Sequence, residues 1–494
     1  MTQLLGFGTG TVNFFGRYAY VGAGKGGFAA VPWTEQDEPQ AVIGSHLQRL
    51  AYPDDYQKHV AGGRILTDAY THGASDIEDL TLRGEYLYTA NGPDGFRVFD
   101  VADVDQKGFS ERVVTAPVSP LGQRTYVHTK FATSVTLPST LGIDPLRQHL
   151  DVDGQTNVNE ERPIDPFYAF VYITDLDEGL VIVNVGTLVD GNPDNNFLHK
   201  DVVFNPGGIL NGARFAAAAG HRLYVCTPRG LVIVDVSNPM QPRIAGQVTD
   251  GWLSNPRAVA IQFRYAFVTD DDGLKVLDIT DPIHPVPIKS ATVHLRDAHR
   301  LYLARTYAYV ADGRDGLAIV KIENPEHPSI FELFNAGGQL NDTRAVQIGS
   351  VAASMYALVA DGKNGLRVLQ LISPDTVPGA AGFSPPPSPR LIATYITKGP
   401  AVAISRGLDR DRVVDETGGQ TVVFGRRGSG PLTPQDWNLF LRHSDGSLFK
   451  VQDVVSIDGK LTTRSGQTLP APLAPLPAPA TPTPSPFDTR RIMP

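Results

Sequence analysis

The sequence predicts an all-β protein folded as a β-propeller, and two observations carry this prediction. A phrase made of an apolar run, a polar turn ending in glycine and a second apolar run recurs at residues 18–31, 86–101, 168–185, 223–236, 265–279, 307–322 and 355–371. The seven turn glycines are Gly27, Gly95, Gly179, Gly230, Gly273, Gly316 and Gly365, separated by 68, 84, 51, 43, 43 and 49 residues. The shortest interval, 43 residues, matches the period of about 40–45 residues typical of a four-stranded propeller blade. We therefore expect seven four-stranded blades.

The composition of each repeat favours strands. Val, Ile, Tyr and Phe dominate the apolar runs, and these residues suit a pleated surface. The turns carry Asp, Asn and Gly, which tolerate the positive φ of tight hairpins. Residues 231–236 are almost continuously apolar, which indicates a strand buried on both faces between two neighbouring blades.

Two further strands complete each predicted blade. A weaker inner strand precedes the hairpin, at 215–219, 258–262, 301–304 and 345–348. A proline-marked turn and a polar outer strand follow it, as in residues 238–248, and residues 388–394 repeat this pattern late in the chain. Proline suits an outer strand because an edge position need not donate every ladder hydrogen bond.

The repeat resembles that of a known family. Residues 231–235 read Leu-Val-Ile-Val-Asp, and over roughly residues 17–397 the chain resembles the LVIVD-repeat family. The resemblance implies a β-propeller of the kind found in bacterial and archaeal surface proteins. Some relatives are joined to, or associated with, multihaem cytochromes, so the resemblance also implies a multihaem cytochrome as a protein partner.

The repeat also sets the expected domain boundaries. The ring is expected over residues 1–397, with insertions at 32–77 and 103–166 where the repeat spacing is long. Residues 398–468 are expected to form a small β-rich appendage, because 400–405 reads as an inner strand and 412–424 as a degraded hairpin. The alternative is that this segment forms an eighth blade. Residues 469–494 form a proline-rich tail that favours an extended conformation.

Composition excludes several classes of protein. The net charge of −9 over 494 residues argues against a general nucleic-acid binder, which carries a basic face. The one cysteine, Cys226, and the absence of a CxxCH motif exclude an internal disulfide and covalently attached haem. Cys226 lies inside a predicted strand and is expected to be a buried packing residue. No apolar stretch approaches about 18 residues, so no membrane span is expected.

The N-terminal residues carry no signal-peptide pattern. The chain is then expected to be cytoplasmic, part of a longer secreted polypeptide, or carried out of the cytoplasm with a partner. With the family resemblance, we expect an extracytoplasmic or cell-surface setting.

The strongest candidate site is a set of repeating arginines, Arg214, Arg257, Arg300 and Arg344, each at the start of an inner strand. Inner strands line the channel of a propeller, so we expect an arc of guanidinium groups near one mouth, able to bind a carboxylate, a phosphate or an acidic partner. The alternative is structural, because each arginine has an Asp or Asn nearby in sequence that could fix the turn between blades. These neighbours are Asn211, Asn255, Asp297 and Asp342.

The acidic residues give weaker signals. The hairpin aspartates are expected to make local hydrogen bonds within their turns. Within the second insertion, Asp151, Asp153, Asn157 and Glu160 offer oxygen ligands that suit calcium, although Gly154 is misplaced for an EF-hand loop. We expect a noncatalytic interaction or scaffold propeller. The alternatives are a metal-dependent propeller hydrolase, marked by carboxylates and histidines converging in the channel, and a glycan-binding surface propeller.

Overall fold

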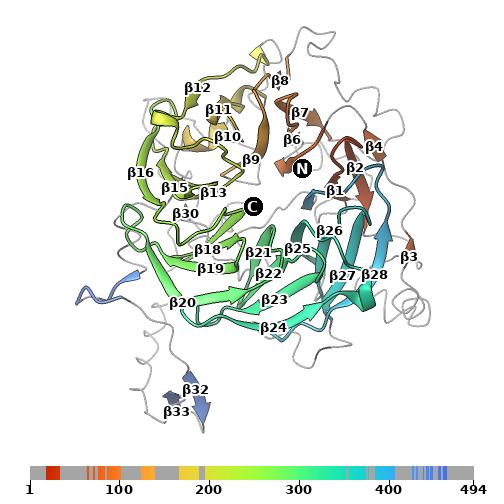
Figure 1. Ribbon diagram of the computed structural model, residues 1–494, viewed down its shortest axis with the longest axis vertical. Coiled ribbons are helices and arrows are strands. Elements are labelled where there is room, and N and C mark those ends of the chain that lie inside the picture. Colours follow the sequence, from red (N-terminus) through yellow and green to blue (C-terminus); the bar gives the residue numbers. More distant parts are fainter. Residues whose placement is uncertain are drawn as a thin grey trace, which may run out of the picture. The chain divides into compact units, whose positions relative to one another are not determined.

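The computed structural model contains seven antiparallel sheets arranged as blades around a central channel (Figure 1). It describes residues 18–33, 64–65, 70–72, 76–83, 86–101, 124–138, 166–188, 195–351, 354–373, 377, 384–406, 426–427, 430–431, 435, 438, 441–443, 445–448, 454–457 and 460–463. The predicted fold class, a seven-bladed β-propeller, is confirmed.

Strands of the first three blades run from the channel outward as follows. The first blade contains β29 (Ala403–Arg406), β1 (Tyr18–Gly22), β2 (Phe28–Pro32) and β4 (Tyr70–His72). The second contains β5 (Asp79–Arg83), β6 (Tyr86–Ala90), β7 (Phe96–Asp100) and β8 (Tyr126–Val127). The third contains β9 (Ala132–Thr136), β10 (Phe170–Asp175), β11 (Gly179–Asn184) and β12 (Val202–Phe204).

In each of the other four blades, the four strands are consecutive in the chain. The fourth contains β13 (Phe215–Ala219), β14 (Arg222–Thr227), β15 (Gly230–Asp235) and β16 (Arg243–Val248). The fifth contains β17 (Ala258–Gln262), β18 (Tyr265–Asp270), β19 (Gly273–Asp278) and β20 (Val286–His294). The sixth contains β21 (Leu301–Ala304), β22 (Tyr307–Ala311), β23 (Leu317–Lys321) and β24 (Ser329–Phe334). The seventh contains β25 (Ala345–Val351), β26 (Ser354–Ala360), β27 (Leu366–Ile372) and β28 (Arg390–Tyr395), and β3 (Arg64–Ile65) adds to its outer edge in parallel.

The ring closes through β29. The inner strand predicted at 400–405 is present, but β29 pairs with β1 and is the inner strand of the first blade, so it opens no eighth blade. Chain segments from opposite ends of the ring thus share one sheet, and the free edge of β1 is paired. Beyond the ring, β30 (Arg426–Arg427) pairs with β31 (Gly430–Pro431). In a separate compact unit, residues 450–494, β32 (Val454–Ile457) pairs with β33 (Lys460–Thr463).

The core lies between the blades. Each pair of neighbouring blades encloses a hydrophobic cluster, and the cluster between the seventh and first blades is as well formed as the others. Strand β15 shows the reason: residues 230–234 are all buried, because one face packs on the third blade and the other on the fifth. Cys226 lies in the cluster between the fourth and fifth blades with no exposed surface, as expected of a packing residue. Among the described residues, no helix is long and apolar enough to cross a membrane.

Candidate functional site: the channel mouth

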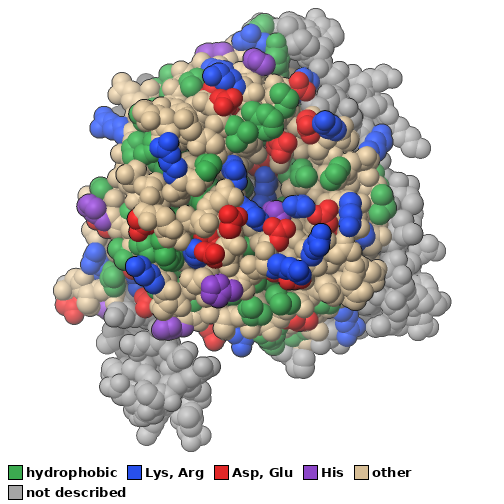
Figure 2. All heavy atoms as spheres, in the orientation of Figure 1, with side chains coloured by type: hydrophobic (Ala, Val, Ile, Leu, Met, Phe, Trp, Pro, Cys, Tyr) green, Lys and Arg blue, Asp and Glu red, His purple; other side chains and the backbone are tan. Residues whose placement is uncertain are grey.

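The channel opens at one mouth into a pocket of about 490 Å³. In Figure 2 the face is hollowed at the centre of the ring, with basic side chains around the hollow. The structure places all four arginines singled out from the sequence on this pocket. Its lining consists of Glu78, Thr133, Leu176, Arg214, Asn255, Arg257, His299, Arg300, Arg344 and Val402.

Six of the lining residues share one position in their blades, one or two residues before the inner strand, which we call the rim position. At this position the backbone N–H donates to a carbonyl near the end of the second strand of the same blade, over 2.8 to 3.0 Å. The pairs are Val402 with Gly22, Glu78 with Ala90, Arg214 with Cys226, Arg257 with Thr269, His299 with Ala311, and Arg344 with Ala360. The rim is therefore basic in blades four, five and seven, and acidic in blade two.

This register corrects the sequence alignment in the sixth blade. Counting back from the turn glycine aligns Arg300 with Arg257, but the rim position of this blade is held by His299. The turn 312–316 is one residue longer than the turn 270–273, so the glycine is a poor reference point. Counting thirteen residues back from the hairpin aspartate would have found His299 from Asp312, as it finds Arg257 from Asp270.

Arg300, one residue beyond the rim, extends across the channel. Its guanidinium forms an ion pair with Asp79 of the second blade and donates to the Glu78 carbonyl at 3.3 Å. The guanidinium also lies over the ring of Phe215 in the fourth blade, with the Cζ atom 5.3 Å from the ring centroid. Arg300 therefore joins the sixth, second and fourth blades and forms the floor of the pocket.

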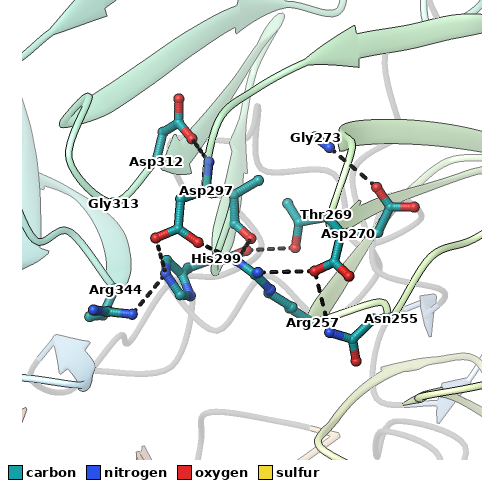
Figure 3. A network of polar contacts seen from close by, with 12 residues as sticks. Asn255, Arg257, Thr269, Asp270, Gly273, Asp297, His299, Asp312, Gly313 and Arg344 are labelled. Carbon is teal, nitrogen blue, oxygen red and sulfur yellow. Dashed lines mark hydrogen bonds and ion pairs between the residues drawn. The ribbon is translucent and has the colours of Figure 1, made fainter.

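Arg257 and Arg344 are neutralised by nearby carboxylates, and Figure 3 shows Arg257 beside Asp297 and Arg344 beside His299. Arg257 donates to Asp297 Oδ1 at 2.7 Å and to Asp271 Oδ1 at 3.0 Å. Arg344 donates to Asp342 Oδ1 from Nη2 at 2.6 Å and from Nε at 2.9 Å. Asp342 is the neighbour that the structural alternative expected for Arg344. Asp297, expected beside Arg300, instead binds Arg257 of the preceding blade. These two arginines hold neighbouring blades in place.

Arg214 differs from the other three arginines. Its guanidinium donates at 2.7 Å to the side-chain oxygen of Asn255, a neutral group, and the arginine is exposed to solvent. Asn211, the other amide expected near it, accepts instead from the Asn205 side chain. Arg214 therefore keeps the least compensated positive charge on the pocket.

His299 is held neutral by its surroundings. Its Nε2 atom lies 2.9 Å from Arg344 Nη1 and 3.2 Å from Asp297 Oδ2. Because arginine only donates, Nε2 accepts this hydrogen bond. Burial lowers the pKa of His299, the positive charges of Arg344 and Arg257 lower it further, and Asp297 opposes them. For Asp297, burial alone would raise the pKa, but the hydrogen bond and the positive charge of Arg257 lower it.

The hairpin aspartates bond to backbone N–H groups of their own turns, as predicted for turn residues, and of the connections next to the channel mouth. Asp270 accepts from the backbone N–H groups of Asp272 and Gly273 within its turn, and from Ser254 in the connection to its blade. Asp175, Asp312 and Asp361 make equivalent bonds in their blades. Burial raises the pKa of Asp312 and of Asp361.

The predicted calcium ligands Asp151, Asp153, Asn157 and Glu160 lie outside the described residues. Within the ranges that the structure does describe, no three His, Cys, Asp or Glu side chains are grouped as metal ligands.

Comparisons with known proteins agree with this architecture. The family model of the LVIVD repeat matches residues 169–193, 216–250, 255–292 and 296–336. The chain is therefore a seven-bladed β-propeller that carries LVIVD repeats. A search of curated proteins finds no match.

Among solved structures, a protein from Lactobacillus plantarum is 12% identical, with 80% of this chain and 99% of that chain covered and a TM-score of 0.50. A candidate 6-phosphogluconolactonase from Bacteroides uniformis is 12% identical, with 78% and 98% covered and a TM-score of 0.47. At this identity the likeness is one of fold alone.

Proposed function

We propose that the protein is a noncatalytic interaction module, a rigid ring that binds a charged group of a partner protein in the pocket at its channel mouth. The observation that carries the proposal is the convergence of Arg214, Arg257, Arg300 and Arg344 on one pocket. A volume of about 490 Å³ lies within the range of about 300–1,000 Å³ typical of ligand sites. Because the other three arginines are bound to carboxylates, Arg214 is the group best able to take a new anion.

The proposed setting is an extracytoplasmic or cell-surface assembly, in which the propeller acts as a scaffold. A multihaem cytochrome is the proposed partner. Both suggestions rest on the resemblance to LVIVD-repeat proteins. We place the partner contact at the mouth, because the loops there present a preformed surface and a preformed surface lowers the entropic cost of binding.

The pair of His299 and Asp297 bears on the hydrolase alternative. A metal-dependent hydrolase would use such a pair to hold a cation. Here His299 accepts from Arg344, and Asp297 accepts from Arg257. A cation at this place would have to displace two guanidinium groups and then sit beside their positive charges. These contacts favour a structural role for the pair.

Purification of the tagged protein from its native cells tests the proposal. The variant Arg214→Gln removes the least compensated charge, and Arg243→Gln on the outer strand β16 removes an exposed arginine away from the mouth. We expect a stoichiometric partner to copurify with the wild type and with Arg243→Gln, and to be depleted at least about tenfold with Arg214→Gln, the typical loss for one charged hydrogen bond. Equal recovery with both variants would refute a partner site at the mouth.

A further inference from the structure

Two opposite charges on the pocket have no ion-pair partner among the residues that the structure describes. Glu78 is at the rim of the second blade, and within the described part of the chain its carboxylate oxygens have no hydrogen-bond or ion-pair partner. Arg214 is at the rim of the fourth blade, and its guanidinium is bonded to a neutral amide. The remaining arginines are compensated by carboxylates, so these two groups decide what charge pattern the pocket offers to a ligand.

Arg300 shows that the two groups face one space. Asp79 follows Glu78 in sequence and Phe215 follows Arg214, and the guanidinium of Arg300 contacts both Asp79 and Phe215. One guanidinium group therefore spans the channel directly beneath the two rim residues. Both Glu78 and Arg214 line the pocket above this floor.

The wall between the two charges is less polar. Thr133 of the third blade lies between the second and fourth blades. Its hydroxyl hydrogen-bonds to the carbonyl oxygens of Ala213 at 2.8 Å and Thr174 at 3.0 Å. Leu176 and Val402 supply apolar surface to the same pocket. The pocket thus presents a negative group, a short apolar wall and a positive group.

We propose that the pocket binds a zwitterion, a small molecule that carries both an ammonium and a carboxylate group, such as an amino acid or short peptide. Arg214 binds the carboxylate and Glu78 binds the ammonium group. This inference rests on the proposed use of the mouth as a binding site, and it names the chemistry of the bound group.

The electrostatics of Glu78 agree with this assignment. Burial raises the pKa of Glu78, nearby Asp76 raises it further, and Arg300 only partly offsets them. An ammonium group placed against Glu78 would relieve this strain, since an opposite charge favours the ionised carboxylate. A simple anion would instead meet repulsion from Glu78, so the pocket discriminates against ligands that carry only negative charge.

Calorimetric titration of the full chain tests the proposal with glycine, glycylglycine and triglycine, which differ in the separation of their two charges. The tightest binder is then compared with its N-acetyl form, which lacks the ammonium group, and its amide form, which lacks the carboxylate. We expect each blocked form to bind at least about tenfold more weakly, as for the loss of one charged hydrogen bond.

Two variants assign the charges. Glu78→Gln should weaken binding of the zwitterion at least about tenfold. It should not weaken binding of the N-acetyl form, which no longer meets the negative charge of Glu78. Arg214→Gln should weaken binding of the zwitterion at least about tenfold. It should not weaken binding of the amide form, which no longer meets the positive charge of Arg214. The control Arg243→Gln should change none of these affinities, and thermal melts check that all variants are folded.

The outcomes separate this inference from the proposed function. If no zwitterion binds at millimolar concentration, or if the N-acetyl form binds as well as the zwitterion and Glu78→Gln has no effect, the inference is overturned. Partner capture that still depends on Arg214 would then leave the proposed function standing. If Arg214→Gln changes neither zwitterion binding nor partner capture, both the inference and the proposed function are overturned.

Discussion

Removal of Arg300 should destabilise the ring more than removal of its partner Asp79. Asp79 is buried, with 3% of its surface exposed, and its carboxylate also accepts from the backbone N–H groups of Leu80 at 2.9 Å and Val135 at 3.0 Å. The variant Arg300→Met leaves this carboxylate buried without a counter-ion. Breaking a buried ion pair in this way costs about 3–5 kcal/mol.

The reverse substitution is milder. In Asp79→Asn, the amide oxygen can still accept a backbone N–H, and the Arg300 side chain, 21% exposed, still reaches solvent and the Glu78 carbonyl. We expect a loss of about 1–3 kcal/mol, the cost of one unsatisfied group. The double variant should be more stable than Arg300→Met alone, because it no longer buries an unpaired charge.

Thermal melts followed by calorimetry measure these differences. With an unfolding entropy of about 2.1 cal/mol/K per residue and roughly 400 cooperative residues, a loss of about 3–5 kcal/mol lowers Tm by about 4–6 °C. The control Arg243→Met, on an exposed outer strand, should change stability by less than about 0.5 kcal/mol. A Tm for Arg300→Met within about 1 °C of the wild type, or strictly additive losses in the double variant, would refute a cross-channel ion pair.

Four further variants or reagents test other parts of the structure. Glu78→Gln should raise Tm at neutral pH, because burial raises the pKa of Glu78. The contribution of Glu78 to stability is full at low pH and is lost as pH rises through the pKa of the folded state. The gain in Tm should therefore shrink at about pH 4, and a gain independent of pH would contradict this reasoning. Ile404→Ala should cost about 2–5 kcal/mol because β29 is packed between blades, whereas Ile396→Ala, at a 62% exposed side chain, should cost less than about 0.5 kcal/mol; equal urea midpoints would argue against ring closure by β29. Gly365→Ala should cost at least about 1–2 kcal/mol, since its φ is +78° and a Cβ would lie 2.2 Å from a carbonyl oxygen of β28; an unchanged midpoint would show that the turn tolerates a side chain. Burial raises the pKa of the Cys226 thiol, so iodoacetamide should label it in urea but not in the native protein, and rapid native labelling would mean that the blades open there.

The blade could be predicted from the sequence because its strands lie close together in the chain. The predicted hairpin at 265–279 is β18 and β19, and its partner strand at 258–262 is β17. All three lie within about half a repeat, where alternation, β-branched residues and turn glycines specify pairing directly. The predicted outer strand within 238–248 is likewise β16.

The closure of the ring is a non-local property. Residues 400–405 have the composition of an inner strand, but nothing in them specifies β1 as the partner. That choice follows from the geometry of the complete ring. Once the seventh blade is in place beside the first, the inner edge of β1 is still unpaired, and β29 pairs with it. Sequence reasoning therefore recognised the strand and placed it in the wrong sheet.

The candidate site was predictable to the extent that it repeats. The arginines recur with the blade, so they could be found, and their shared mouth follows from their shared position. Glu78 and His299 hold the same position with different residue types, and Arg300 and Asp79 lie 221 residues apart. A search for repeated residues does not detect such substitutions, although alignment on the ends of the second strands does.

The distribution of residues at the rim therefore separates what builds the ring from what is specific to this protein. A seven-fold repeat would place the same side chain at every rim position, and a ring of identical cations would repel itself. Instead, the hairpin turn of blade five supplies Asp271, and the connections between blades five, six and seven supply Asp297 and Asp342. These carboxylates neutralise Arg257 and Arg344. Within the described ranges, Glu78 of blade two and Arg214 of blade four have no ion-pair partner. The structural arginines already have carboxylate partners within the protein. Glu78 and Arg214 gain an opposite charge only when a ligand binds, so ligand binding lowers their electrostatic free energy. We therefore place recognition at these two residues.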